Sequence, residues 1–432
     1  MREQNGFWKV AFRPALGAAA TVFLLTGQVF VEGGIWTTKT PMATARSGLA
    51  AAVIDGRLHA VGGVMPGPAD TYFNAVEVYD PKTNIWTARA PLPAPKAYAA
   101  AGVVDSTLYI VDGTSVEAYD PHSNTWTSKA AMPTPRWGLA VPVVDGILYA
   151  IGGFRPAFTN IEFNTVEAYE PKTNSWTTKS PMPTNRCCMV AGVIDGLIYV
   201  AGGTRTVGHG GTETFATLEV YDPKTDTWTT KSSMPTHRSG AASGVINSEL
   251  YVIGGTLNRQ ADLIKSTVEA YDSETDTWRT VVSIPTPRLF AGAGAMDDTL
   301  YVVGGYPALA VNEAFSPFLS VAIDIKPGDA NNTINLRSNG TILVAILSTA
   351  EFGATTVDPA TVKLAGAPVA TQGRGTPMTS VADLNRDGRL DLLLHFRTQD
   401  LELEPAATEV VLKGRTFSGE LIRGVDSVRI VP

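Results

Sequence analysis

The sequence predicts an all-β fold in which similar four-stranded antiparallel sheets repeat along the chain and a smaller β module follows them. Two observations carry this prediction. Tryptophans stand at positions 36, 86, 126, 176, 228 and 278, at spacings of 50, 40, 50, 52 and 50 residues. An alternating segment and a turn precede each of the last five, as in "VEAYEPKTNSW" at 166–176. A fixed period of this length indicates one supersecondary unit per repeat.

The composition is typical of an ordered chain that is rich in turns. Of the 432 residues, 44% are hydrophobic and 17% are charged, with 41 Gly and 28 Pro. The net charge of -7 and the lack of a basic run argue against a nucleic-acid partner, whose phosphates attract Lys and Arg. The two cysteines, Cys187 and Cys188, are adjacent, so they provide neither a disulfide framework nor a CxxC metal spacing. They either form a strained vicinal disulfide or alternate as two thiols in and out of a strand.

The N-terminal segment, residues 1–31, has the features of a secretory signal. Arg2, Lys9 and Arg13 precede an apolar run at 15–31, "ALGAAATVFLLTGQVFV". The alternative is a retained membrane anchor, although a run of 17 residues is marginal for crossing a bilayer. We therefore expect a secreted, periplasmic or cell-surface protein that touches a membrane only through an uncleaved N-terminal segment.

Each repeat is predicted to contain four strands joined by tight turns. Segments such as "YDPKTNIW" at 79–86 combine Asp, Pro and Asn in the order that favours a turn between the third and fourth strands. A loop follows each tryptophan, and then come a Gly/Ala-rich run, an Asp-Gly turn and a second strand, as in "WGLAVPVVDGILYAIGG" at 137–153. Asp-Gly is a strong hairpin signal, and small side chains in the first strand suit the crowded centre of a radial assembly.

These segments resemble kelch repeats. The resemblance rests on an Arg near the start of the repeat and on the patterns "LYxxGG" and "VExYDPxTxxW", and it covers residues 36–317. It implies a β-propeller in which each repeat of about fifty residues is one four-stranded blade.

The two ends of the repeat region complement each other. The last repeat runs from Arg288 through "LYVVGGY" to Glu313, Ala314 and Phe315, and no tryptophan strand follows it. At the other end, the strand around Trp36 has no preceding partner. We therefore predict a six-bladed propeller over residues 33–317 in which the Trp36 strand completes the last blade and leaves no large exposed sheet edge.

Binding is expected on the face that carries the loops between second and third strands. These loops range from "TS" at 114–115 to "TRTVGHGGTETFAT" at 204–217, and variable loops on a rigid scaffold are where binding normally resides. One cation precedes each innermost strand on this face. The six are Arg46, Lys96, Arg136, Arg186, Arg238 and Arg288. Such a ring attracts anions, and the resemblance implies an acidic ligand, because arginines at this place hold one in some kelch propellers.

The alternative is that the cations belong to the fold. A Glu recurs at positions 77, 117, 167, 219, 269 and 313, and these carboxylates can pair with the cations without any ligand. Residues that depart from the repeat pattern are further candidates. They include Tyr98, Trp137, the cysteine pair and Phe290 beside the cations, and Arg155 and Arg205 in the long loops. The candidate ligand-binding residues are Arg46, Arg136, Trp137, Arg155, Arg186, Arg205, Arg238 and Arg288.

The expected function is recognition of a glycan, an acidic peptide or a cell-surface protein by a monomeric binding module. A sugar-active enzyme is the alternative, since the chain resembles an exported kelch mutarotase, and Glu213 and His209 are candidates for acid–base work. A scaffold without a ligand of its own is a third possibility. The sequence contains no GxSxG, HExxH or phosphate loop, and we assign no catalytic residue.

From Phe318 onward the period stops and β-rich runs alternate with Gly, Pro and Asp turns, which predicts a small antiparallel sandwich over 318–432. This part resembles a module appended to many exported bacterial proteins. Its segment "DLNRDGRLD" has oxygen donors at the spacing of a calcium loop, with glycine at the bend. The candidate ligands of a structural calcium ion are Asp383, Asn385, Asp387, the Arg389 carbonyl and Asp391. Position 12 is Leu394, so this is not a full EF-hand, and the alternative is a turn without an ion.

Overall fold

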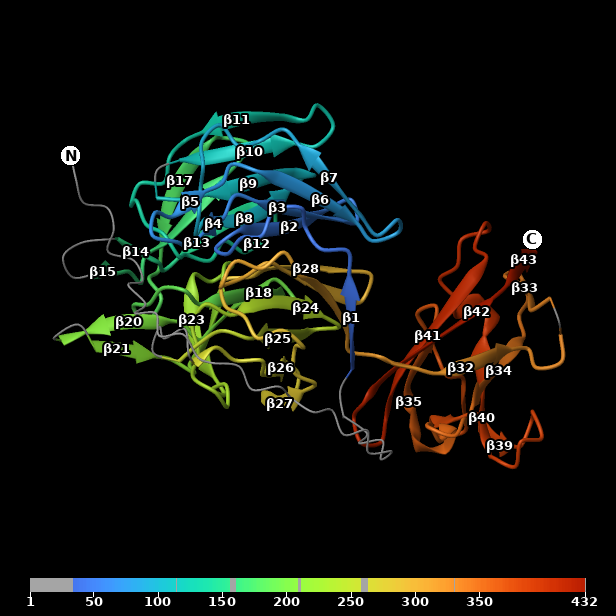
Figure 1. Ribbon diagram of the computed structural model, residues 1–432. Coiled ribbons are helices and arrows are strands. Elements are labelled where there is room, and N and C mark those ends of the chain that lie inside the picture. The colour runs from blue at the N-terminus through green and yellow to red at the C-terminus, as the bar shows by residue number, and fades with distance from the viewer. Residues whose placement is uncertain are drawn as a thin grey trace, which may run out of the picture. The chain divides into compact units, whose positions relative to one another are not determined.

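The computed structural model describes residues 34–113, 115–155, 161–208, 211–257, 263–329 and 331–431 (Figure 1). The described chain divides into two compact units, unit 1 with residues 36–315 and unit 2 with residues 34–35 and 316–431. The predicted signal segment lies outside the described residues. Within the described ranges, no helix is long and apolar enough to cross a membrane. Both units consist of strands joined by turns, so the all-β prediction is confirmed.

Unit 1 contains four-stranded antiparallel sheets, one for each repeat, in which the strand order follows the chain from the first strand outward. The first three sheets are β2 (Ala50–Ile54), β3 (Arg57–Val61), β6 (Val76–Asp80) and β7 (Ile85–Arg89); β8 (Ala100–Val104), β9 (Thr107–Val111), β10 (Val116–Asp120) and β11 (Thr125–Lys129); and β12 (Val143–Val144), β13 (Ile147–Ile151), β16 (Val166–Glu170) and β17 (Ser175–Lys179).

The next two sheets follow the same order: β18 (Val190–Ile194), β19 (Leu197–Ala201), β22 (Leu218–Asp222) and β23 (Thr227–Lys231); and β24 (Ala242–Ile246), β25 (Glu249–Ile253), β26 (Val268–Asp272) and β27 (Thr277–Val281). The last repeat provides β28 (Gly292–Met296), β29 (Thr299–Val303) and β30 (Asn312–Ser316), and its fourth strand is β1 (Ile35–Lys39) from the start of the repeat region. The Trp36 strand therefore completes the last repeat, as predicted.

The second and third strands of each sheet are buried, because the neighbouring sheets cover both of their faces. The aromatic residue of the third strand packs on the tryptophan of the fourth, as between Tyr79 and Trp86, whose ring centroids are 5.2 Å apart. First strands carry small residues because the next sheet approaches closely. A Cβ atom on Gly192 would lie 2.7 Å from Leu250 of the following repeat.

The indole groups of the repeat tryptophans connect each sheet to the preceding one. Trp86 Nε1 donates to the Thr40 carbonyl at 2.8 Å, and the same bond recurs at the tryptophan of each of the other fourth strands. The donors and acceptors are Trp126 and Ala90, Trp176 and Ala130, Trp228 and Ser180, Trp278 and Ser232, and Trp36 and Val282. The bond from Trp36 to the fifth repeat returns the series to its beginning.

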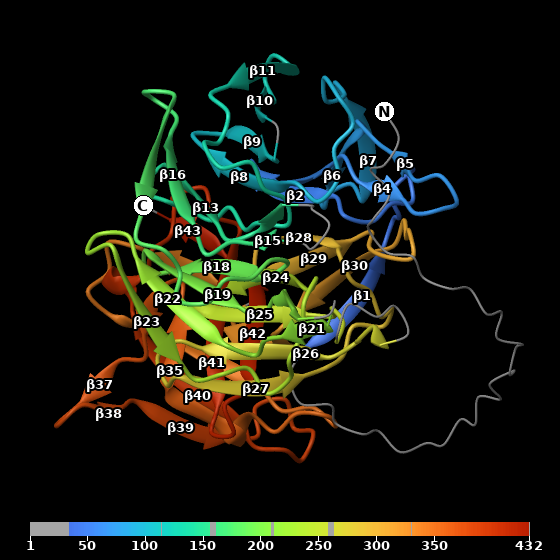
Figure 2. The same cartoon turned by 90° about the vertical axis from the view of Figure 1, so that its left-hand side faces the viewer.

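Three loops between second and third strands form two-stranded hairpins (Figure 1 and Figure 2). They are β4 (Val64–Met65) with β5 (Thr71–Tyr72), β14 (Phe154–Arg155) with β15 (Ile161–Glu162), and β20 (Thr204–Val207) with β21 (Gly211–Thr214).

Unit 2 has a five-stranded and a four-stranded sheet that share one hydrophobic core, to which Val344 and Leu394 contribute from one sheet and Val362 and Leu412 from the other. The first sheet comprises β31 (Leu319–Ser320), β42 (Leu421–Ser427), β41 (Glu409–Thr416), β35 (Val357–Leu364) and β36 (Ala367–Pro368). The second comprises β32 (Ala322–Ile325), β34 (Thr341–Leu347), β40 (Asp391–Arg397) and β39 (Thr379–Ala382). Smaller elements are the pairs β33 (Thr333–Asn335) with β43 (Arg429–Val431) and β37 (Thr371–Gln372) with β38 (Thr376–Pro377), and the 3-10 helices η3 (Ala354–Thr356) and η4 (Thr398–Asp400).

Candidate functional site

The five predicted arginines of the cation ring are fully buried. The exposed fraction is 0% for Arg46, Arg136 and Arg186 and 1% for Arg238 and Arg288. Each guanidinium forms an ion pair with the Glu of a third strand. The pairs are Arg46 with Glu77 at 3.2 Å, Arg136 with Glu167 at 2.5 Å, Arg186 with Glu219 at 2.9 Å, Arg238 with Glu269, and Arg288 with Glu313.

All three guanidinium nitrogens of Arg136 donate hydrogen bonds, whereas Nε of Arg46, Arg186 and Arg238 is buried without a partner in the structure. Arg136 Nε donates to the Gly152 carbonyl at 2.7 Å, Nη1 to the Thr134 carbonyl at 2.9 Å and Nη2 to the Ala150 carbonyl at 2.8 Å. Burial lowers the pKa of the Arg136 guanidinium, and the hydrogen bond to Glu167 opposes this shift. The predicted role of these arginines as ligand contacts conflicts with their burial, because a ligand needs accessible atoms. The geometry supports the alternative that they belong to the fold.

The second repeat departs from this pattern. Lys96 replaces the arginine, and its Nζ donates to Asp112 at 2.8 Å and to Ser115 at 2.7 Å. Trp137 covers the place where the double glycine of the other repeats is missing, since a Cβ atom on Gly113 would lie 2.5 Å from the indole ring. Trp137, a predicted ligand contact, is therefore half-buried and packs on the second repeat.

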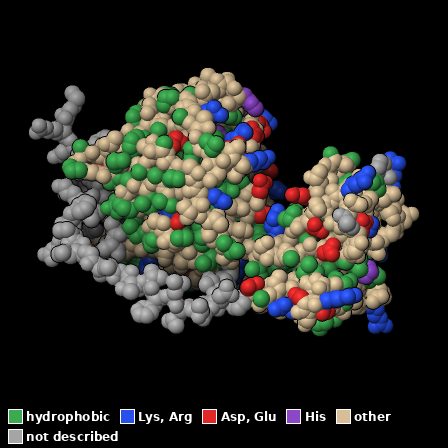
Figure 3. All heavy atoms as spheres, turned by 45° about the vertical axis from the view of Figure 1, so that its right-hand side comes forward, with side chains coloured by type: hydrophobic (Ala, Val, Ile, Leu, Met, Phe, Trp, Pro, Cys, Tyr) green, Lys and Arg blue, Asp and Glu red, His purple; other side chains and the backbone are tan. Residues whose placement is uncertain are grey.

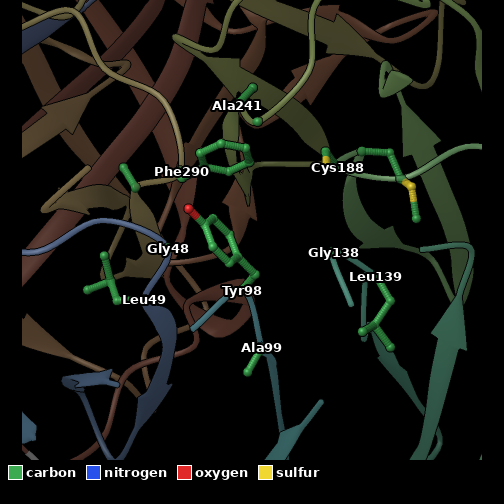
Figure 4. A pocket seen from close by; sticks show the side chains of 12 residues that line it. Gly48, Leu49, Tyr98, Ala99, Gly138, Leu139, Cys188, Ala241 and Phe290 are labelled. Atoms are coloured by element: carbon green, nitrogen blue, oxygen red, sulfur yellow. The ribbon is translucent and has the colours of Figure 1, made fainter. Parts of the chain in front are cut away.

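A central pocket of about 170 Å³ opens at the positions two and three residues after each cation (Figure 4). Every repeat contributes one such pair of residues. The lining consists of Gly48, Leu49, Tyr98, Ala99, Gly138, Leu139, Cys188, Met189, Gly240, Ala241, Phe290 and Ala291. None of the residues in the buried ion pairs belongs to this lining, so the pocket presents small, aliphatic, aromatic and sulfur-bearing side chains.

The first residues of these pairs form a closed circle of backbone hydrogen bonds, in which each N–H donates to the carbonyl of the preceding repeat at 2.7–3.2 Å. The circle runs through Gly48, Tyr98, Gly138, Cys188, Gly240 and Phe290, and back to Gly48. All six residues have a positive φ between 53° and 62°. Glycine adopts this conformation without strain, whereas a side chain at this φ costs about 1 kcal/mol.

Aromatic and sulfur-bearing side chains alternate with the glycines around the circle. The Tyr98 and Phe290 rings pack edge to face with centroids 5.2 Å apart, and Figure 4 shows them together, with Cys188 on another side of the pocket. Tyr98 covers Gly48, and Phe290 covers Gly240. Burial raises the pKa of the Tyr98 phenol.

The two cysteines do not alternate in and out of a strand, which was one of the two predicted arrangements. Their side chains meet, because Cys188 lies in the left-handed region at φ 58° just before β18. The Cys188 thiol donates to Cys187 Sγ with the sulfurs 3.0 Å apart.

The hairpins β4–β5, β14–β15 and β20–β21 carry exposed apolar side chains, which we call the loop-face patch. Its members are Met65, Tyr72, Ile161 and Val207, with exposed fractions of 41%, 49%, 42% and 39%. Backbone bridges place the hairpins beside the pocket, since Ser47, Trp137 and Cys187 pair with the first residues of β4, β14 and β20. Figure 1 shows the three hairpins at one end of unit 1.

The remaining predicted contacts, Arg155 and Arg205, lie on these hairpins. Arg155 is exposed on β14. Arg205 pairs with Glu213 at 2.7 Å, donates to Asn185 at 3.2 Å and stacks over the Phe215 ring at 5.3 Å. The structure therefore brings both residues beside the patch and separates them from the buried arginines. His209 lies outside the described residues.

Two family models match the sequence of unit 1. Residues 116–305 match the KLHDC2/KLHL20/DRC7 Kelch-repeats domain, and residues 45–93 match the Kelch motif. These matches support a kelch β-propeller for unit 1. Among solved structures, the chain is similar to the one titled "Structure of YjhT", with a TM-score of 0.54 and 15% identity over 68% of this chain and 98% of that one. A search of curated proteins found no match.

The kelch repeats themselves contain the signal for the pocket. When the repeats are aligned on their cations, Tyr98, Cys188 and Phe290 fall where the other repeats have glycine. The sequence-based interpretation noted these residues only as departures near the arginines. It did not predict that these six equivalent positions share one backbone conformation and line one pocket.

In unit 2 the predicted calcium segment forms a tight loop before β40. Asp383 Oδ1 and Asn385 Oδ1 both accept a hydrogen bond from the Asp387 N–H at 3.1 Å, and Asp383 Oδ2 accepts one from the Gly388 N–H at 3.0 Å. Hydrogen bonding to the Arg389 N–H holds the pKa of Asp387 below its usual range. The side-chain oxygens of Asp383 and Asn385 therefore lie on the inside of the loop.

Asp391 has a different role from the other predicted ligands. Its exposed fraction is 0%, and its two oxygens accept hydrogen bonds from the Ser348 N–H at 2.8 Å and the Leu384 N–H at 2.9 Å. It anchors the loop to β34. Among the described residues, no three His, Cys, Asp or Glu side chains are grouped so as to hold a metal ion.

Proposed function

We propose that unit 1 is a six-bladed kelch propeller that binds another protein through its loop-face patch and central pocket. Kelch propellers generally mediate protein interactions, and the chain matches kelch repeat models. The observation that carries the proposal is that exposed large apolar side chains gather on the three hairpins next to the pocket. The circular hydrogen bonds support the ring, since they run through every repeat and return to the first.

The chemistry of this face favours an apolar contact with a polar rim. Exposed apolar groups are a recurrent feature of protein-binding surfaces, and their burial contributes about 25 cal/mol per Å². Arg155 borders the patch, is exposed, and can pair with an acidic group of a partner, whereas Arg205 is already paired with Glu213. An acidic peptide held by the cation ring is a weaker proposal, because those arginines are already paired.

The pocket supports the same preference. A cavity of about 170 Å³ has room for roughly one side chain, whereas small-molecule pockets typically have about 300 Å³ or more. Among the lining side chains, Tyr98 and Cys188 carry the polar groups that could pair with the hydroxyls of a sugar. For the sugar-active alternative, Glu213 is the candidate carboxylate, and Arg205 pairs with it at 2.7 Å.

A matched pair of variants tests the proposal. Tyr72→Ser and Val207→Ser together remove two members of the patch, and Ile85→Ser removes an apolar side chain that is 57% exposed on the fourth strand of the first repeat. We expect proteins from the producing cells to be captured by wild type and by Ile85→Ser, and to be lost from the double variant. Equal capture by all three would contradict the proposal. Figure 3 shows that hydrophobic side chains are also interspersed elsewhere on unit 1, which makes such a control necessary.

We also propose that unit 2 is a β-sandwich whose 383–391 loop binds a structural calcium ion. Asp383, Asn385 and Asp387 supply hard oxygen donors of the type calcium prefers. Oxygens of Asp383 and Asn385 both accept from the Asp387 N–H, and the Asp387 carboxylate pairs with the Arg389 guanidinium at 3.2 Å. The Arg389 carbonyl is the fourth expected ligand, while Asp391 holds the loop in place. The ion would order the loop. Binding is measured by titrating the calcium-free protein with CaCl₂ in a calorimeter, with MgCl₂ as control.

Export remains a proposal that rests on the sequence of residues 1–31, where basic residues precede an apolar run. The expected result is a mature protein in the periplasm, on the surface or in the medium, with its N-terminus close to residue 31. Fractionation followed by N-terminal sequencing measures both properties. Recovery of the intact N-terminus in the cytoplasm would contradict export.

A further inference from the structure

We propose that Cys187 and Cys188 form a redox-active dithiol, which small disulfides oxidise to a vicinal disulfide at the wall of the central pocket. The two sulfur atoms are 3.0 Å apart, and Cys188 lines the pocket. This modification site is independent of any binding partner.

The backbone holds both cysteines in place. The Cys187 N–H and carbonyl exchange two hydrogen bonds with Thr204, each of 2.9 Å. The Cys188 N–H donates to the Gly138 carbonyl, and the Cys188 carbonyl accepts from the Gly240 N–H, both at 2.8 Å. Because four hydrogen bonds fix the two peptide units, the proximity of the sulfurs is imposed by the fold.

Cys188 has a backbone conformation that is uncommon for residues other than glycine. The equivalent residue is glycine in three repeats, and a non-glycine residue at φ 58° costs about 1 kcal/mol. Tyr98 and Phe290, which share this conformation, pack their rings against each other. At Cys188 the same conformation instead turns the side chain toward Cys187, since adjacent side chains in a regular strand point to opposite faces.

The difference in exposure indicates which of the two thiols reacts first. Cys187 is 1% exposed, whereas Cys188 is half-buried and borders the pocket. The Cys188 thiolate is therefore the group that attacks one sulfur of a small disulfide, and it displaces the other half as a thiolate. The Cys187 thiolate then attacks Cys188 Sγ and releases the second half. Both cysteines are oxidised, the small disulfide is reduced to two thiols, and the two cysteine protons end on these products.

The product is expected to be easily reduced. Adjacent Cα atoms lie about 3.8 Å apart, whereas disulfides usually join Cα atoms roughly 4.4–6.8 Å apart. Such strain raises the reduction potential and is typical of labile, regulatory disulfides. Oxidation also replaces two thiols at the pocket wall by a rigid ring, so the redox state alters the surface that a partner would meet.

The test uses the native full chain, first reduced and freed of reductant, and then incubated with cystine. Intact mass measures the product. We expect wild type to lose two hydrogen atoms, to retain no cysteine adduct, and to return to the starting mass in dithiothreitol. Cys187→Ser should keep one cysteine adduct on Cys188, because the second attack is impossible.

Two further results test which thiol reacts first and whether the two sulfurs can join to each other. Cys188→Gly should react more slowly than Cys187→Ser by a factor of about ten or more, since only the buried thiol remains. The same residue types stand at the equivalent places in the repeats of Ser47-Gly48 and Ser239-Gly240, so both variants keep the fold of this segment. A wild type that stops at the mixed disulfide, forms intermolecular dimers, or reacts no faster than Cys188→Gly would overturn the proposal.

Discussion

Replacing Arg136 with methionine should strongly destabilise unit 1. Methionine keeps an apolar stem but removes the partner of Glu167, which is 2% exposed, and the donors of three backbone carbonyls. Removing one member of a buried ion pair costs about 3–5 kcal/mol, because the other charge remains buried. Thr134 still donates to the Glu167 carboxylate at 2.9 Å, so we expect the unfolding free energy to fall by about 3 kcal/mol, the low end of this range.

Urea unfolding monitored by tryptophan fluorescence measures this loss in the full chain. All seven tryptophans in the described ranges lie in unit 1, and residues 316–432 contain none, so their signal reports on unit 1 and not on unit 2. The control is Arg57→Met, which removes an arginine paired with Asp80 at 3.1 Å but with 51% of its side chain exposed. We expect its midpoint to stay close to wild type, because water screens an exposed pair. Equal midpoints for the two variants would refute the structural role of the buried arginines.

Three further predictions concern acid, backbone space and calcium. Burial lowers the pKa of His59 to about 4, so below pH 6.5 the unfolded chain binds more protons than the folded chain. Lowering the pH from 6.5 to 4 should therefore cost on the order of 3 kcal/mol of stability. In urea titrations, His59→Gln should lose less stability over this pH range. In the same assay, Gly254→Ala should destabilise the protein more than Gly56→Ala, by about 2 kcal/mol or more. A Cβ atom on Gly254 would lie 2.4 Å from a backbone carbonyl oxygen, whereas a Cβ atom on Gly56 would meet no atom within 4 Å. Calcium at about 30 times its Kd should stabilise unit 2 by about 2 kcal/mol in calorimetry, and Asp383→Asn should abolish this gain, whereas a gain that persists would contradict the loop site.

The repeat architecture was predictable because the pattern residues form contacts that the fold needs in every repeat. Tyr79 and Trp86 stack, and the Trp86 indole bonds to the preceding repeat. The Asn in the turn does more than favour a turn, since Asn84 Oδ1 accepts hydrogen bonds from the Tyr79 hydroxyl and from the Thr40 N–H of the neighbouring strand. Such contacts between repeats impose the period.

The binding residues were less predictable because charge alone does not indicate depth. Arg136 lies outside any strand, so alternation of polar and apolar residues gives no sign of its burial. The meeting of Cys187 and Cys188 depends on a left-handed residue that is not glycine, which local sequence does not indicate. Comparison with the glycines at the equivalent positions of other repeats is the signal that finds it.

The central claim is that the loop face, and not the buried cation ring, contacts a protein partner. The most direct measurement introduces a photo-crosslinking residue at Tyr72 or Ile161 of the patch, or at Ile85 as control, in cells that produce the protein. The account predicts a protein adduct of one mass from both patch positions and none from position 85. An adduct from position 85 alone, or no adduct from either patch position, would contradict it.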